Sequence, residues 1–292
     1  MAIIDAVLNY RRWLKRRNCS PHTVRNYMNT LKHFVLWLAQ PIEAVDSHTV
    51  GQFIDQLIGK RLHPKTINCY LDSVRSFYSY LINEEQVKIL NPVKRGYLLR
   101  LPRPLPRHLR DEQVPRLFAV IQSKRDRAMF MLMLRCGLRV EEVAKLTLPA
   151  LDLRRAQLFV YQGKGNKGRV VYVSNDAKEA LTDYLQRRPA SRASALFLVD
   201  KGRCKGRPLS VRGIQKRMEL YAQRSGLEVS CHQLRHTMAT QLLNADAALV
   251  TIQDLLGHAR VRTTQRYCRV SNLKVQRDYQ QAIGKVIQRH AL

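Results

Sequence analysis

The chain has 292 residues, of which 51 are Lys or Arg and 22 are Asp or Glu, giving a formal net charge of +29. Hydrophobic residues make up 45% of the sequence, which is ordinary for a globular protein and excludes a disordered polycation. The longest apolar run, from Ala128 to Leu134, is far shorter than the roughly 18 residues that a membrane span requires. Six scattered cysteines without a CxxC pair predict a reducing cytoplasm and no disulfide framework.

The positive charge is spread along the whole chain. Residues 1–100 carry 15 basic and 7 acidic residues, and residues 101–292 carry 36 and 15. Such a surplus repels itself unless an anion neutralises it, and a DNA duplex carries one negative charge per about 1.7 Å of its axis. Charge alone therefore favours nucleic acid as the partner of both halves over the alternative of a solvated basic face.

The length predicts two domains, and the first, residues 1–100, shows only helical periodicity. Two of its helix starts combine a capping residue with a following proline, at Ser20-Pro21 and His63-Pro64. Three prolines between positions 102 and 106 exclude helix and central strand, so residues 101–108 are expected to form an extended basic linker. The helices predicted for the first domain cover residues 2–17, 23–38, 50–58 and 66–81.

Residues 109–292 are expected to form the second domain. Two strand-like runs, 158–162 and 169–174, flank a Gly- and Lys-rich segment that predicts a hairpin. The predicted fold class is therefore mainly α with a small antiparallel β-sheet. The helices predicted here cover residues 111–123, 125–136, 140–146, 176–187, 211–225, 231–244, 250–257, 263–267 and 272–288.

Two short motifs resemble cofactor sites that their context excludes. The sequence from Gly163 to Gly168 has the GxGxxG spacing of dinucleotide sites, but a strand follows it where such a site needs a helix N-terminus. His232 and His236 have the spacing of a zinc-binding HExxH helix, but Gln233 replaces the glutamate that acts there as general base. No nucleotide or metal cofactor is expected.

Unusual polar residues recur in the otherwise apolar helices of the second domain. Arg139 follows a glycine at a helix start, and His232 and Arg235 lie three residues apart, so they share one helix face. Each residue alone has an ordinary alternative, such as a surface arginine or a histidine that favours a helix C-terminus. The other candidates are Lys164 in the hairpin, His258 at a helix end and Tyr267 nine residues later.

Together, in this order and spacing, the residues resemble the tyrosine recombinases, which include the phage-type integrases and the Xer-like resolvases. The resemblance covers nearly the whole chain, including residues 20–27 of the first domain. It implies a helical, SAM-like core-binding domain that clasps DNA, followed by a mixed α/β catalytic domain. The motifs that match are Gly137-Leu-Arg139-x-x-Glu142, Gly163-Lys164-Gly-Asn-Lys167, His232-x-Leu-Arg235-His236, Leu256-Gly-His258 and Thr263-Thr-x-x-Tyr267.

The resemblance implies a site-specific recombinase that transfers a DNA phosphodiester to Tyr267 and back through a 3′-phosphotyrosine, without metal or ATP. Arg139 and Arg235 are expected to clamp the non-bridging oxygens, because bidentate geometry is the advantage of arginine. The remaining expected roles are proton acceptor for His232, phosphate contact for His258 and general acid for Lys164.

Glu142 lies one helical turn after Arg139, so we expect it to orient a neighbouring side chain; the alternative is a solvent-exposed helix acid. DNA contacts are expected from basic residues of both domains and of the linker, namely Arg25, Lys65, Arg75, Arg103, Arg107, Lys167 and Arg169.

The resemblance also implies an oligomer on double-stranded DNA with an inverted-repeat core site, a dimer on one site and a tetramer on two, in a nucleoid-associated location. The resemblance is also compatible with a partner recombinase or accessory proteins that act with this chain. Residues 272–288 carry an apolar stripe that includes Val275, Tyr279 and Ile283, which predicts a C-terminal helix that buries this stripe against another surface. The resemblance implies that this helix, 272–290, docks on a neighbouring protomer. Its alternative is docking on its own domain.

Two other functions remain open at this point. A non-catalytic DNA-binding relative would lack one of the active-site residues, and a type IB topoisomerase-like enzyme would act as a monomer without a docking tail.

Overall fold

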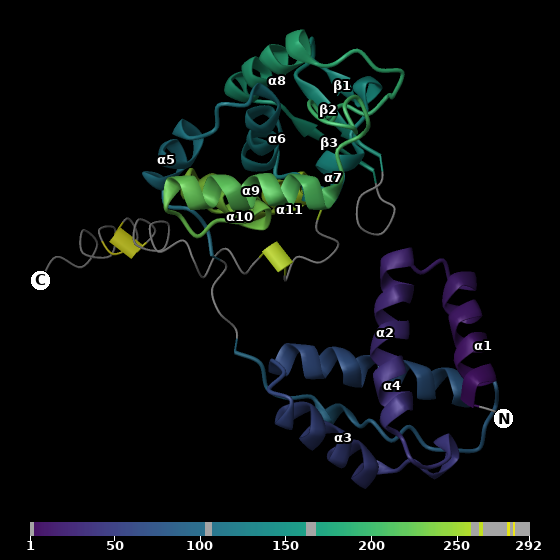
Figure 1. Ribbon diagram of the computed structural model, residues 1–292. Helices are drawn as coiled ribbons and strands as arrows, with labels where there is room; N and C mark the ends of the chain where they lie inside the picture. The colour runs from purple at the N-terminus through teal and green to yellow at the C-terminus, as the bar shows by residue number, and fades with distance from the viewer. Residues whose placement is uncertain are drawn as a thin grey trace, which may run out of the picture. The chain divides into compact units, whose positions relative to one another are not determined.

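The structure is a computed structural model that describes residues 3–102, 107–161, 168–257, 263–264, 279–280 and 283. The chain divides into two compact units, Met1–Arg103 and Pro104–Leu292 (Figure 1). The division falls inside the proline-rich segment 101–108. None of the helices in these described ranges is both long and apolar enough to cross a membrane.

Helices account for the regular structure of residues 3–102. The helix α4 packs against α1, α2 and α3, and the buried aromatic side chains Phe34, Phe53 and Phe77 lie in the shared core (Figure 1). Burying each such ring stabilises the unit by roughly 1.5–3 kcal/mol. The elements are α1 (Ile3–Arg16), α2 (Pro21–Trp37), η1 (Ile42–Ala44), α3 (Ser47–Gly59), α4 (Pro64–Asn83) and η2 (Arg95–Tyr97).

The two capping motifs define helix starts as predicted. The Ser20 hydroxyl accepts a hydrogen bond from the Thr23 backbone N–H at 3.1 Å, and His63 Nδ1 accepts one from the Lys65 N–H at 3.2 Å. Each satisfies an N–H that has no partner within its own helix, and the proline that follows lacks an N–H to satisfy.

The second unit is built around α6, whose residues Ala128 to Leu134 are all buried. This helix packs against α8 and α10, so the longest apolar run of the chain forms a core helix (Figure 1). The elements are α5 (Gln113–Ala119), α6 (Lys124–Arg135), α7 (Val140–Lys145), η3 (Leu148–Ala150), β1 (Leu151–Asp152), β2 (Gln157–Val160), β3 (Arg169–Tyr172), α8 (Asn175–Arg187), α9 (Val211–Ser225), α10 (Cys231–Asn244) and α11 (Leu249–Leu256).

The sheet is antiparallel, with strand order β1-β2-β3. Leu158 on β2 pairs with Val171 on β3, and both side chains are fully buried. The predicted fold class is thus confirmed, although both predicted strands are longer than those observed, and the two-residue strand β1 was not predicted. The hairpin segment 162–167 lies outside the described residues.

One helix prediction differs from the structure, and two others fall largely outside the described residues. The predicted helix 111–123 is shorter, Gln113–Ala119, because Ser123 already caps α6 by accepting a hydrogen bond from the Asp126 N–H at 3.4 Å. Of the predicted helices 263–267 and 272–288, only Thr263, Thr264, Tyr279, Gln280 and Ile283 are described, and these five are helical.

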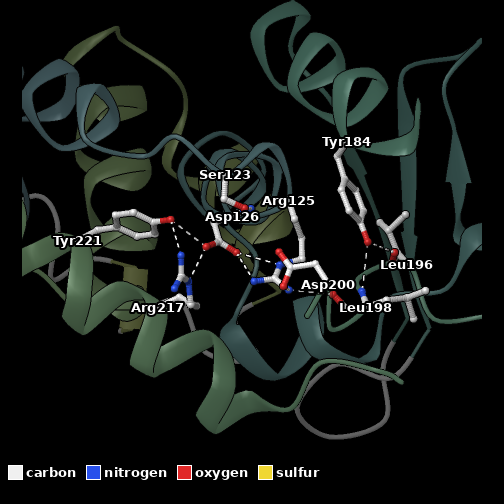
Figure 2. Close-up of polar contacts among 9 residues, drawn as sticks. All are labelled: Ser123, Arg125, Asp126, Tyr184, Leu196, Leu198, Asp200, Arg217 and Tyr221. Atoms are coloured by element: carbon white, nitrogen blue, oxygen red, sulfur yellow. Dashed lines mark hydrogen bonds and ion pairs between the residues drawn. The ribbon is translucent and has the colours of Figure 1, made fainter. Parts of the chain in front are cut away.

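A buried polar cluster ties the core helix α6 to its surroundings (Figure 2). The Asp126 carboxylate is fully buried; its Oδ1 accepts from Arg125 Nε at 2.9 Å, and its Oδ2 accepts from Arg217 Nε at 2.6 Å and from the Tyr221 hydroxyl at 2.9 Å. Arg125 Nη1 also donates to the backbone carbonyl of Leu198 at 3.0 Å. This cluster connects α6 with α9 and with the segment around Leu198.

Candidate active site

A glycine turn between α6 and α7 brings the backbone close to two later helices. Gly137 has φ +64°, in the left-handed region that favours glycine. A Cβ at this position would lie 2.8 Å from Leu256 Cδ2 and 3.2 Å from Met238 Sδ, which belong to α11 and α10. Glycine therefore allows the chain to approach α10 and α11 just before Arg139.

Arg139 begins α7 and is held by Glu142 one turn later. The Glu142 carboxylate accepts from the Arg139 backbone N–H at 2.8 Å and from Arg139 Nη1 at 2.7 Å. Glu142 is only 5% exposed, so the alternative of a solvent-exposed helix acid is wrong. The Arg139 side chain keeps 22% exposure, so its guanidinium is fixed on one side and accessible on the other.

A second arginine, Arg169 at the start of β3, binds the same carboxylate. Its Nη1 and Nη2 donate to the two oxygens of Glu142 at 2.8 Å each. Burial alone would raise the pKa of Glu142, but the hydrogen bonds and charges of Arg169 and Arg139 outweigh it and lower the pKa to about 2. The carboxylate is therefore charged at neutral pH and suited to orient cations, not to carry protons.

This position of Arg169 differs from the DNA contact that we predicted for it. Its side chain is 10% exposed, and its Nε donates to the backbone carbonyl of Leu255 at 2.9 Å. All three nitrogens of the guanidinium thus donate to groups of the protein itself, so the structure places Arg169 behind Arg139 and not at the surface.

Arg235 lies on α10 with 1% exposure. Its Nη1 donates to the carbonyl of Gly137, and its Nη2 donates to the carbonyl of Leu256 at 2.6 Å. These bonds place Arg235 beside the same glycine turn that precedes Arg139. One turn earlier on α10, His232 is exposed, and its ring centroid lies 4.2 Å from that of His236.

The structure thus brings together Arg139, Glu142 and Arg235, with His232 on the helix of Arg235. Three predicted site residues, Lys164, His258 and Tyr267, lie outside the described residues. The role of Arg169 was missed by the sequence analysis.

The predicted DNA-contacting residues fall into different environments. Arg25 and Lys65 in the first unit and Arg107 in the second are exposed. Arg75 is largely engaged, because its Nε and Nη2 donate to the carbonyls of Val93 and Lys94 at 3.1 and 2.9 Å. Arg103 and Lys167 lie outside the described residues.

The residues around His232 have a structural explanation that involves no metal. The Gln233 side chain accepts a hydrogen bond from the Ser230 backbone N–H at 2.6 Å, which caps the start of α10. Among the residues that the structure describes, His, Cys, Asp and Glu side chains form no group of three that could hold a metal ion.

Both units of the chain match known protein families. Residues 107–274 match the phage integrase family, and residues 8–85 match the phage integrase N-terminal SAM-like domain. The chain is 36% identical over 262 residues to tyrosine recombinase XerC of Thermodesulfovibrio yellowstonii, covering 86% of both proteins. It is 31% identical over 269 residues to tyrosine recombinase XerA of Thermococcus kodakarensis, covering 91% of both.

The fold is also similar to a solved structure. A crystal structure of a lambda integrase dimer bound to a COC′ core site matches with a TM-score of 0.75 at 17% identity, over 91% of this chain and 95% of that one.

Proposed function

The chain belongs to the phage integrase family of tyrosine recombinases, and from this premise we propose which of its residues cut and rejoin DNA. It is a site-specific DNA recombinase that acts through a covalent tyrosine intermediate. The proposed nucleophile is Tyr267, whose phenolic oxygen attacks a backbone phosphorus. A 3′-phosphotyrosine forms, the bond to the 5′-oxygen breaks, and the reverse attack by a 5′-hydroxyl rejoins the strand.

The observation that carries the residue assignment is the pair of anchored arginines. Arg235 is buried against the carbonyls of Gly137 and Leu256, and Arg139 is held by Glu142. The Arg139 guanidinium is accessible to the non-bridging oxygens over which negative charge spreads during attack, whereas Arg235, 1% exposed, adds its positive charge from within the unit. Because both are fixed before the substrate binds, little reorganisation is required in the transition state.

The proton transfers are assigned to the remaining residues of the motif. A tyrosine phenol in water has a pKa of about 10, so Tyr267 must lose its proton during attack, and the exposed imidazole of His232 accepts it. Lys164 protonates the departing 5′-oxygen. His258 donates a hydrogen bond to the phosphate.

We also propose that the enzyme acts as an oligomer on DNA whose core site is an inverted repeat. One dimer occupies one site, and the two dimers on a pair of sites form a tetramer. A partner recombinase or accessory proteins can act in the same complex. The segment 272–290 docks on a neighbouring protomer, a head-to-tail contact of the type that closes into a ring. In support, Tyr279, which belongs to the apolar stripe, is 64% exposed in the isolated chain.

The exposed cations of both units supply the electrostatic part of binding. Arg25, Lys65 and Arg107 are accessible to phosphate oxygens, and together with the net charge of +29 they support contacts from both units.

The nucleophile is tested with Tyr267→Phe, which keeps the ring and removes the attacking oxygen. Footprinting on the DNA that flanks the gene first identifies the protected inverted repeat. A nicked duplex carrying that repeat then traps the covalent adduct, because the fragment beyond the nick diffuses away. We expect the variant to bind this duplex but to give no shifted band on a denaturing gel.

The control is Tyr279→Phe, a tyrosine of the same C-terminal region, which should form the adduct. A covalent band from Tyr267→Phe would assign the nucleophile elsewhere. If the unmodified chain protects the repeat but forms no adduct, it is a non-catalytic binding protein. Relaxation of supercoiled plasmids with and without the repeat at equal rates would indicate a topoisomerase-like enzyme.

A further inference from the structure

The last turn of α11 is a point where three arginines from three different elements meet. Arg169 Nε on β3 donates to the carbonyl of Leu255 at 2.9 Å, and Arg235 Nη2 on α10 donates to the carbonyl of Leu256 at 2.6 Å. Arg139 Nη2 at the start of α7 lies 3.5 Å from the carbonyl of Gly257. Three consecutive carbonyls therefore each face one guanidinium.

This arrangement follows from the physics of a helix end. The last carbonyls of a helix have no partner within it and form the negative end of its dipole, so cations stabilise them. Gly257 ends the helix with φ +60°, and a Cβ there would lie 3.0 Å from Arg169 Cδ and 3.2 Å from Arg169 Nη1. The glycine thus lets the Arg169 side chain pack directly against the helix end.

Arg169 connects this helix end with the carboxylate that holds Arg139. Its Nη1 and Nη2 donate to Glu142, and its Nε donates to Leu255, so one rigid planar group joins β3, α7 and α11. The side chain is 10% exposed, compared with 22% for Arg139. Arg169 is therefore engaged behind the site, while Arg139 keeps access to a ligand.

We propose that Arg169 is a positioning residue for DNA strand cleavage. It fixes the Glu142 carboxylate, which in turn fixes the Arg139 guanidinium, and it aligns both with the end of α11. The chain continues from Gly257 directly to His258 and reaches Tyr267 ten residues later. This inference rests on the proposed function and adds a residue to it.

The geometry requires an arginine at this position. The three bonds leave from three different nitrogens of a planar fork, whereas the ammonium of lysine is a single point charge on a flexible stem. Arg169→Lys preserves the positive charge but cannot reach Leu255 and both oxygens of Glu142 in the same geometry. The substitution therefore shows whether adduct formation depends on the orientation of the side chain or only on its charge.

The experiment uses the full chain and the nicked duplex described above. Adduct formation is timed at saturating DNA, and DNA affinity is measured separately, for Arg169→Lys, Glu142→Gln and the double variant. The matched control is Arg135→Lys, because Arg135 Nε pairs with Asp176 at 2.7 Å at the surface of the same unit. A thermal melt gives the folded fraction to which each rate is normalised.

We expect Arg169→Lys to slow adduct formation by about 10–100-fold, the range found when a residue that orients a functional ligand is replaced. Its DNA affinity should stay within about twofold, and Arg135→Lys should match the unmodified chain. In the Glu142→Gln background the same substitution should slow the reaction by less than about twofold, because two residues that act through one contact are not additive.

Three results would overturn the inference. Equal slowing in both backgrounds would mean that Arg169 acts independently of Glu142. An unchanged rate at saturating DNA, with lower affinity and a weaker salt dependence, would make Arg169 a DNA contact. An unchanged rate and affinity would mean that it has no part in cleavage. An unmodified chain that forms no adduct would instead contradict the proposed function itself.

Discussion

The second unit contains two buried carboxylates, each bound by two arginines. The two clusters differ in what else those arginines contact. Asp126 binds Arg125 and Arg217, and Glu142 binds Arg139 and Arg169. Both carboxylates are nearly inaccessible, with exposures of 0% and 5%.

The arginines around Asp126 contact other groups of the same unit. Arg125 is 6% exposed and donates to Leu198 and Asp200, and Arg217, whose side chain is 35% exposed, donates to the hydroxyl of Tyr221 (Figure 2). These contacts join α6 to α9 and to the segment around Leu198, which is a structural role.

The cluster at Glu142 contains one partly exposed guanidinium, that of Arg139. Arg169 and Arg139 share the carboxylate, but only Arg139 remains partly exposed beside the end of α11. A buried carboxylate with two arginines therefore does not by itself mark a functional site. Exposure alone does not distinguish the clusters either, because the Arg217 side chain is 35% exposed and that of Arg139 is 22% exposed. The distinguishing feature is position: Arg139 lies at the end of α11, where Arg235 also donates to a backbone carbonyl, whereas Arg217 contacts Tyr221 on its own helix.

Replacing the structural carboxylate should have the largest effect on stability. Asp126→Asn leaves two arginines without their buried counter-charge, and removing one partner of a buried ion pair costs about 3–5 kcal/mol. We expect a large fall in the free energy of unfolding, measured by urea denaturation, with an unchanged adduct rate per folded molecule. The control Asp183→Asn breaks a partly exposed pair with Lys124, which solvent screens, so its effect on stability should be much smaller. A specific loss of cleavage in Asp126→Asn would remove the distinction between the clusters.

Glu142→Gln should affect stability slightly less and cleavage much more. The pKa of Glu142 in the folded protein is about 2, below its ordinary value of 4.5, so its charged form stabilises the fold at any pH above 4.5. That contribution, about 3 kcal/mol, is lost as the pH falls from 4.5 toward 2. The stability difference between the unmodified chain and Glu142→Gln should therefore be full at neutral pH and shrink in this acidic window.

The same variant should form the covalent adduct about 10–100-fold more slowly, because Arg139 loses the group that orients it. Urea denaturation at several pH values measures the first effect, and the nicked duplex measures the second. A stability difference that is constant from pH 7 to pH 2 would contradict the assigned role of the Glu142 charge.

Much of the helical architecture could be predicted because its signals are local. Ser20 and His63, each followed by proline, fix the starts of α2 and α4, and Gly226 ends α9 at the predicted residue. The strand β1 could not be predicted, because two residues carry no periodicity and pairing with β2 defines it.

The candidate site was predictable in its residue types but not in its contacts. Spacing identifies Arg235, but its burial depends on carbonyls of Gly137 and Leu256, which are distant in sequence. Arg169 was assigned to DNA on the basis of charge, and the strand sequence could not correct this, because Arg169-Val-Val-Tyr-Val carries apolar residues on both faces. Val171 is buried, Val170 is 39% exposed, and Arg169 shares the inner face of the strand with Val171.

The smallest expected effect concerns two glycines that end helices with nearly the same backbone geometry. Gly257 ends α11 with φ +60°, and Gly226 ends α9 with φ +64°. Replacing either by alanine places a Cβ in the left-handed region, which costs about 1–2 kcal/mol. Both variants should therefore melt at similarly lowered temperatures.

Only one of the two substitutions should disturb the arginines of the candidate active site. At Gly226 the new Cβ would meet the free end of the Arg116 side chain at 3.0 Å, which can move away. At Gly257 it would meet the Cδ, Nε and Nη1 atoms of Arg169, which are held by Glu142 and Leu255. Gly257→Ala should therefore slow adduct formation severalfold while Gly226→Ala leaves it unchanged. Equal rates in the two variants would show that the end of α11 does not position the arginines around it.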